Sequence, residues 1–444
     1  MKFVLGIVAL IIGILVGESA YRFTVITKSV CNVGTFVSGL FLLDIVFPFL
    51  YILCAGNIRD IWYFPVLSMT DFALAFFVLS LGYSIFIACF NVMLSKNKTN
   101  YYDRNSLDRY RYAYEIKKMV WFCIVLYLLG IAIDVLCLGG LKPYYKLAMS
   151  RAVNSVVVYP SNVLRYIRYL CGFCLTPSIV SSAVYLCYEK KLIKKMIMMM
   201  ITVFICLTTL SRGTLINYFI AIIVILESKG CSYSSTKRKE KIIFLCAILG
   251  FIIFTGVRGV MTSNYWGDAS YLGVDPISYA FSQLFLSTGA SLYGVARICH
   301  HLRGGGEIFW GISIWEMFYR FIPRSIWVEK PIQYGIQTIN VFLGTPETTM
   351  DAITPVGELV ANFDYFGMVI MPVYGVLAAS FENRRTKGIY TYLYAGFIFP
   401  IITTTVWMGS TGLMSNLISM VFFYILFKIY IKIPKIRIDL IRAK

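Results

Sequence analysis

The chain has 444 residues, of which 59% are hydrophobic and only 14% are charged. An average soluble protein carries about 25% charged residues. Apolar runs approaching or exceeding the roughly 20 residues that cross a bilayer recur along the sequence. Composition therefore excludes an ordinary soluble globular protein and predicts an all-α integral membrane protein with many spans.

The net charge of +19 comes from basic residues that are concentrated in a few segments. More than half of the 41 Lys and Arg lie in five short segments, each of which adjoins an apolar run. These segments are 95–118, 189–195, 228–241, 381–388 and the C-terminal tail from Lys428. Cytoplasmic loops of membrane proteins carry such an excess. We therefore place these segments in the cytoplasm and do not expect nucleic acid as a partner.

Eleven apolar runs are expected to form transmembrane helices. In chain order they are 3–17, 30–54, 63–94, 119–141, 166–188, 196–210, 214–227, 242–256, 354–380, 389–409 and 414–431. The first run resembles a signal peptide, but Glu18 lies close before the cleavage point at Ala20, so we expect an uncleaved span. With the basic segments inside, the C-terminus is cytoplasmic and the N-terminus outside. Lys2 opposes that orientation of the first span.

This topology divides the chain into three parts. Residues 1–256 form the first eight spans with short loops, 257–353 form a large extracytoplasmic segment, and 354–444 form the last three spans and the basic tail. The large segment lacks the basic excess of the inner loops. Its stretches 280–298 and 307–323 are apolar and aromatic, which is typical of helices that lie in the membrane interface. We expect this segment to be partly helical and interfacial or re-entrant.

Five basic residues are predicted on the outer side, close to the membrane surface. They are Arg212 in "LSRGT", Arg258 in "GVRG", and Arg320, Arg324 and Lys330 in "RFIPRSIWVEKP". The guanidinium group presents a planar set of donors that matches phosphate oxygens, so such a group of residues suits a lipid-linked pyrophosphate. The alternative is that each side chain extends to the lipid headgroups.

Acidic and imidazole groups supply candidates for proton transfer. Glu358 in "TPVGELVANF" lies at the outer start of a span, where it could act as a general base. Alternatively, it is an acid in the first turn of a helix that the helix dipole stabilises. His300 and His301 are a second candidate base, or a solvated pair in a loop. Asp44, Asp71 and Asp134 lie within spans, where acids are expected to be structural partners or to face a cavity.

Several common chemistries have no motif in this chain. The sequence contains no P-loop, no GxSxG, no HExxH and no DxD, and its only two His are adjacent. The single CxxC, Cys171 and Cys174, has no second pair, so a zinc site is not expected. We therefore expect no metal site.

With these features together, the chain resembles the Wzy-type O-antigen and capsular repeat-unit polymerases of bacteria. The stretches that carry the resemblance are "LSRGTL" at 210–215, "GVRG" at 256–259, "FIPRSIWVEKP" at 321–331 and "TPVGELVANFDYFG" at 354–367. The number of spans and the late outer segment extend the resemblance over most of the chain. It implies a GT-C-like glycosyltransferase of the bacterial cytoplasmic (inner) membrane, with its active face extracytoplasmic.

The resemblance also implies a reaction and its residues. The enzyme would transfer a growing glycan from undecaprenyl pyrophosphate onto a fresh lipid-linked oligosaccharide repeat, without a cofactor. A chain-length regulator and a flippase would be partners in the same pathway. Glu358, Arg324 and Arg258 would be catalytic, and Arg212, Arg258, Arg320, Arg324 and Lys330 would hold the pyrophosphate.

Two alternatives remain open from the sequence. An O-antigen ligase shares the multispan plan and the donor but transfers the polymer to lipid A core sugars, and such a ligase is expected to present an outer His, as His300 and His301 could. A flippase or transporter for the same lipid-linked sugars would carry charges at the midplane of its spans.

Overall fold

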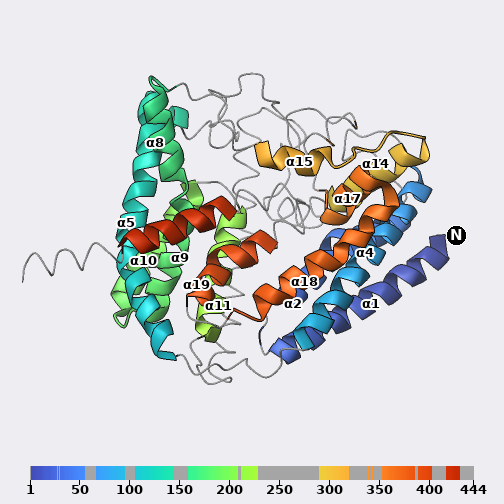
Figure 1. Cartoon of the computed structure of the whole chain (residues 1–444), viewed down its shortest axis with the longest axis horizontal. Helices are drawn as coiled ribbons and strands as arrows, with labels where there is room; N and C mark the ends of the chain where they lie inside the picture. Colours follow the sequence, from blue (N-terminus) through green and yellow to red (C-terminus); the bar gives the residue numbers. More distant parts are fainter. Residues whose placement is uncertain are drawn as a thin grey trace, which may run out of the picture. The chain divides into compact units, whose positions relative to one another are not determined.

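In the part of the chain that it describes, the computed structural model consists of helices joined by turns and contains no strand (Figure 1). The described residues are 2–27, 29, 31–55, 67–95, 106–144, 159–208, 212–228, 290–319, 339, 343, 353–385, 389–402 and 417–430. Six helices are long and apolar enough to cross a membrane, which confirms an all-α membrane protein. They are Lys2–Thr27, Val33–Cys54, Met69–Leu94, Arg111–Cys137, Asn162–Tyr188 and Pro355–Glu382.

Other predicted spans correspond to shorter helices. Thr214–Glu227, Tyr390–Ile402 and Leu417–Tyr430 are apolar but fall short of the length of a full span. The predicted span 242–256 lies outside the described residues. The predicted span 3–17 is too short, because the helix continues to Thr27. Glu18 and Arg22 allow it to continue, since Arg22 Nε donates to Glu18 Oε1 over 3.1 Å across one turn.

The chain folds into two compact units, each assembled from segments far apart in the sequence. Unit 1 comprises Met1–Tyr101, Ser282–Arg384 and Phe399–Asn416, and unit 2 comprises Tyr102–Phe281, Arg385–Ile398 and Leu417–Lys444. The helical segments of unit 1 are α1 (Lys2–Thr27), α2 (Val33–Phe41), the π-helical turn η1 (Leu42–Val46), α3 (Phe47–Ala55), α4 (Met69–Ser95), α14 (Ala290–Arg303), α15 (Ile312–Tyr319), α17 (Pro355–Phe363), the 3₁₀ segment η4 (Asp364–Ile370) and α18 (Met371–Glu382).

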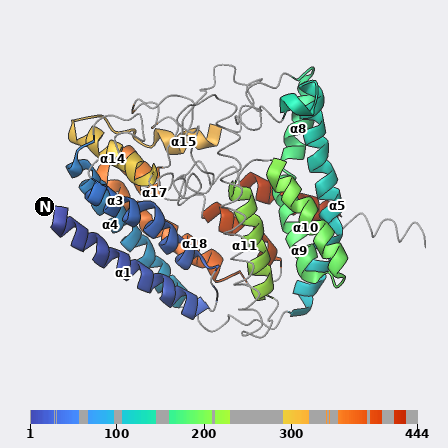
Figure 2. The ribbon, with the colours of Figure 1, turned by 180° about the vertical axis from the view of Figure 1, so that it is seen from behind.

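Within unit 1, α4 and α18 lie side by side in both views (Figures 1 and 2). They run in the same direction, because Gly375 approaches Phe86 and Phe90 while Asn383 Nδ2 donates to the carbonyl of Met93 over 3.4 Å. Gly375 makes the close approach possible, since a Cβ there would lie 2.6 Å from a backbone oxygen of α4. Small residues serve this purpose at membrane helix interfaces.

The α2–η1–α3 segment runs antiparallel to α4. The Ser38 and Tyr83 hydroxyls lie 2.7 Å apart near one end, and the rings of Phe49 and Phe76 stack at 4.2 Å further along. α4 thus has one antiparallel and one parallel neighbour, and the start of α17 lies beside the middle of α4, where Gly82 faces Val356.

Unit 2 contains α5 (Ser106–Cys137), α8 (Asn162–Gly172), α9 (Leu175–Tyr188), α10 (Leu192–Thr208), α11 (Arg212–Ser228), α19 (Tyr390–Leu393), η5 (Tyr394–Ile398) and the helix Leu417–Tyr430. Its core includes Val120, Ile124, Tyr127, Met198 and Ile205. The predicted span 166–188 is divided here into α8 and α9. Pro177 in the first turn of α9 has no N–H for a continuous helix to use, which accounts for the break.

Candidate functional site

The stretch "TPVGELVANF" forms the N-cap and the whole of α17, and it fixes this helix against α15. Thr354 caps the helix by accepting from the Gly357 N–H at 3.2 Å, and Pro355 occupies its first turn. This arrangement suits Thr and Pro at a helix start. Thr354 provides the cap, and the Glu358 side chain is directed toward Ser313 of α15.

Glu358 belongs to a buried polar network between α17 and α15. Ser313 Oγ donates to Glu358 Oε1 at 3.2 Å, and Asn362 Nδ2 donates both to Ser313 Oγ and to the Glu358 carbonyl, each at 2.7 Å. Glu358 and Asn362 share a face because they are four residues apart. The Phe309 N–H also donates to the carbonyl of Ala361 at 3.0 Å, so α15 and the turn before it dock on α17.

This network is buried and inaccessible to solvent in the described conformation. Glu358 is 1% exposed and Ser313 and Asn362 are fully buried. The carboxylate is therefore out of reach of an acceptor sugar unless α15 moves. The network has the properties of an anchor, and the predicted catalytic role of Glu358 stays a prediction.

A second polar cluster lies where α4 begins and α14 ends. Asp71 accepts from the N–H and hydroxyl of Ser68 at 2.9 and 2.6 Å. It also lies 3.1 Å from His300 Nδ1 and accepts from Arg303 Nη1 at 2.7 Å. Asp71 is 1% exposed, whereas the side chains of His300 and Arg303 are about half exposed. In this cluster two half-exposed basic side chains thus contact one buried carboxylate.

The adjacent His residues therefore lie in a helix, and the loop placement considered from the sequence is wrong. Both belong to the last turn of α14, where basic groups interact favourably with the helix dipole. Their environments differ, because His301 Nε2 lies 3.1 Å from the carbonyl of Glu307 in the following turn. Burial raises the pKa of the neighbouring Cys299 to about 12, so that thiol stays neutral.

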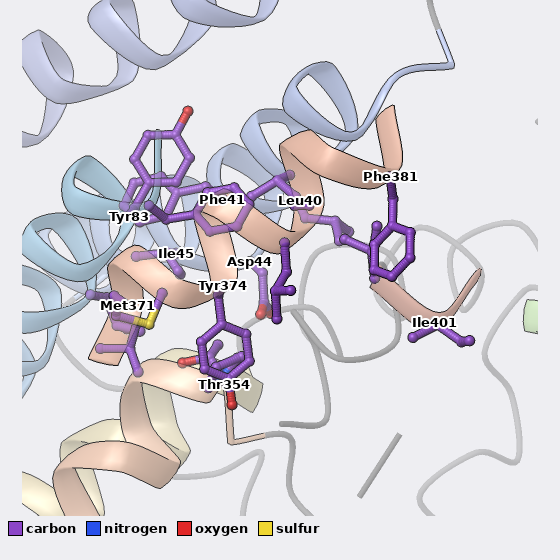
Figure 3. A pocket seen from close by; sticks show the side chains of 18 residues that line it. Leu40, Phe41, Asp44, Ile45, Tyr83, Thr354, Met371, Tyr374, Phe381 and Ile401 are labelled. Atoms are coloured by element: carbon purple, nitrogen blue, oxygen red, sulfur yellow. The ribbon is translucent and has the colours of Figure 1, made fainter. Parts of the chain in front are cut away.

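A cavity of about 160 Å³ lies among α2, η1, α4, α17 and α18, and its lining is almost entirely apolar. Asp44 reaches it from η1, as Figure 3 shows together with Tyr83, Tyr374 and Thr354. Asp44 is buried, and its Oδ1 has no hydrogen-bond partner among the described residues. Its neighbouring polar group is Ser291 of α14. π-Helical turns inside α-helices occur frequently at functional sites.

The other acid predicted within a span is a structural partner. Asp134 of α5 accepts from Arg168 Nε of α8 at 2.7 Å and from the Tyr159 hydroxyl at 2.8 Å. This pair joins two helices of unit 2. The three span acids thus divide as expected between pairing, for Asp71 and Asp134, and a cavity, for Asp44.

Most of the predicted pyrophosphate-binding residues cannot be placed. Arg258, Arg320, Arg324 and Lys330 lie outside the described residues, and Arg212 is described only as the first residue of α11. The predicted basic site therefore stays a prediction. In the described ranges, no group of three or more His, Cys, Asp or Glu is placed to hold a metal ion.

Sequence reasoning missed Ser313 and the Asp71–Arg303 ion pair. "SMTD" at 68–71 has the spacing of a capping box before an apolar run, and that signal places Asp71 at a helix start. His300 and Arg303 are three residues apart, a spacing that brings side chains together on a helix. Nothing in the sequence pairs Ser313 with Glu358.

Comparisons with protein-family models, with curated proteins and with solved structures gave no match to this chain. A function can therefore be inferred only from the residues themselves.

Proposed function

We propose that the chain is a glycosyltransferase that polymerises oligosaccharide repeats carried on undecaprenyl pyrophosphate, at the outer face of the bacterial cytoplasmic membrane. The product would be O-antigen or capsular polysaccharide. The proposal includes eleven spans and a GT-C-like arrangement. Support comes from the four sequence stretches that resemble Wzy-type polymerases, and from the position of one of them in the fold.

The observation that carries the proposal is the location of "TPVGELVANF". It begins beside Gly82 in the middle of α4 and packs on Val295 and Ile298 of α14, whose last turn contacts Asp71 at the start of α4. That start of α4 lies opposite to the end where Met93 and Asn383 meet. The chain continues from that opposite end into the basic segments 95–118 and 381–388. The positive-inside rule assigns those segments to the cytoplasm. Asp71 and the end of α14 then belong to the outer side, where lipid-linked repeats would be joined, and α17, which carries Glu358, packs on α14.

For the proposed glycosyl transfer, the protein has mainly to stabilise the charge on the leaving group and to orient the two substrates. Pyrophosphate is a good leaving group, and donors such as Arg324 and Arg258 would stabilise the charge that develops on it. Arg212, Arg320 and Lys330 would complete the binding site. Glu358 would take the proton of the acceptor hydroxyl, which requires α15 to withdraw Ser313 from its carboxylate.

Substitution at Glu358 separates the catalytic role from the anchoring role. Glu358→Gln keeps the size of the side chain and an oxygen that accepts from Ser313, but it removes the base. A deletion host complemented with this variant should lose polymer at a normal protein level. Ser313→Ala is the matched control, because it removes the hydrogen bond and leaves the carboxylate. Polymer of normal length from Glu358→Gln would show that Glu358 is only an anchor.

Arg324→Ala tests the basic site in the same host. The variant should abolish polymer while the protein accumulates normally in the membrane, because the developing charge on the pyrophosphate is no longer stabilised. Unchanged polymer length would remove Arg324 from the proposed site.

A transporter of the same lipid-linked sugars is the second candidate, and Asp44 favours it. Transporters bind substrates and ions near the bilayer midplane on interrupted helices, and Asp44 lies in a π-helical turn midway along Val33–Cys54. Asp44→Asn removes the charge at constant size. Loss of even single repeats from the cell surface would favour transport, whereas repeats that reach the surface without being polymerised would favour the polymerase.

A further inference from the structure

Of the two candidate bases, His300 is the accessible one, and it lies at the end of unit 1 where α4 begins. Its side chain is 54% exposed, whereas Glu358 is 1% exposed and engaged by Ser313. Both residues belong to elements that pack on each other, since a Cβ at Gly357 would meet Val295 and Ile298 of α14. The two candidate bases thus lie in the same region, and only one of them is open.

The buried carboxylate of Asp71 orients the imidazole of His300. Ser68 fixes Asp71 Oδ2 through its N–H and its hydroxyl, and His300 Nδ1 lies 3.1 Å from the same oxygen. A neutral imidazole beside a carboxylate donates its Nδ1–H to it, which leaves the lone pair on Nε2. Among the described residues Nε2 has no hydrogen-bond partner. The tautomer that Asp71 selects is therefore the one that a general base needs.

Arg303 compensates the negative charge of Asp71 in the Asp71–His300 pair. Its Nη1 donates to the other oxygen of Asp71 at 2.7 Å, so the carboxylate is neutralised while His300 is uncharged. When His300 takes a proton, the cluster gains one positive charge, and Asp71 stabilises the imidazolium through the shared hydrogen bond. The other titratable groups that interact with Asp71 or Arg303 are Cys299 and Tyr365.

We propose that His300 is the general base that activates the acceptor hydroxyl and that Asp71 is its positioning residue. This inference rests on the proposed glycosyl transfer and offers His300, in place of Glu358, as the residue that takes the proton. Polymer that is lost from Glu358→Gln but kept by His300→Gln would assign the role to Glu358 and overturn the inference. The acceptor oxygen attacks the anomeric carbon of the donor sugar and forms the new glycosidic bond. The bond from that carbon to the pyrophosphate oxygen breaks, and undecaprenyl pyrophosphate leaves with the electron pair. The hydroxyl proton moves to Nε2 of His300 and then to water.

The test uses the full-length protein purified into liposomes and single lipid-linked repeats extracted from a host deleted for this chain. His300→Gln should lower the rate of polymer formation by about 10²–10⁴-fold, the usual contribution of a general base. Its remaining rate should no longer fall on the acid side of the pH profile. Asp71→Asn should also lower the rate, because an amide can hold the wrong tautomer.

His301→Gln is the matched control, since His301 is the next residue on the same helix and contacts the Glu307 carbonyl instead of Asp71. It should retain the rate within a few fold. Added imidazole should restore part of the rate to His300→Ala, an effect that a purely structural role does not give. A His300→Gln rate within a few fold of the parent, an equal loss in both Gln variants, or no rescue by imidazole would overturn the inference.

The failure of this inference and the failure of the proposed function are distinguishable. If the deletion host keeps its polysaccharide ladder, the proposed function is wrong and the inference falls with it. If the ladder collapses but His300→Gln polymerises normally, only the role of His300 is wrong.

Discussion

Replacing Asp134 tests whether the buried ion pair between α5 and α8 holds unit 2 together. Asp134 is fully buried, and it accepts from Arg168 at 2.7 Å and from Tyr159 at 2.8 Å. Removing one partner of a buried pair costs about 3–5 kcal/mol. Arg168 is partly exposed and can turn to water, so we expect about 3 kcal/mol for Asp134→Ala, at the lower end of that range. For a unit of this size that corresponds to a fall in Tm of about 6–12 °C.

The measurement is the thermal unfolding of the detergent-purified protein, followed by near-ultraviolet circular dichroism. Asp134→Asn should lose less, because it keeps a hydrogen-bond acceptor. The double variant Asp134→Leu with Arg168→Leu should recover most of the loss, since an apolar pair avoids an unpaired buried charge. If the Tm of Asp134→Ala lies within the uncertainty of the parent value, the ion pair does not stabilise unit 2.

Three further predictions concern packing, pH and the buried acid. Gly375→Ala should destabilise by about 1–3 kcal/mol because its Cβ meets backbone of α4. Gly39→Ala in α2, whose Cβ meets nothing within 4 Å, should not lower the Tm in the same melting assay, because Ala favours a helix over Gly. Hydrogen bonding to Lys117 lowers the pKa of Glu189 from 4.5 to about 2, so its contribution is present above about pH 4.5 and is lost as the pH falls toward 2; Glu189→Gln should flatten that part of the stability profile. Asp44→Asn should raise the Tm, because the buried carboxylate oxygen has no partner among the described residues; a lower Tm would contradict this.

The membrane character of the chain was predictable because it depends on apolar runs, which require no knowledge of tertiary contacts. The ends of those runs were not. Glu18 and Arg22 looked like the end of a span, yet they pair with each other and α1 continues past them. Pro177 marks a break that the apolar run 166–188 hides. The hydrogen bond between Glu18 and Arg22 and the N–H that Pro177 lacks decide where these helices continue or break. A hydropathy profile records neither of them.

The candidate site was predictable only in part, and for a similar reason. Glu358 and Asn362 are four residues apart, so their shared face follows from helix geometry. Their partner Ser313 lies 45 residues before Glu358, and no local pattern links them. Asp71 and His300 are separated by 229 residues, so the contact that orients the imidazole exists only in the folded chain.

Deletion of this chain from its host, followed by a gel of the surface polysaccharide, is the decisive experiment for the proposed polymerase. A polymerase predicts that the ladder collapses to a single repeat on its anchor and that the parent chain restores it. Full-length polymer that is made but not attached would indicate a ligase. Loss of single repeats from the surface would indicate a transporter, and an unchanged ladder would contradict a role in building this polysaccharide.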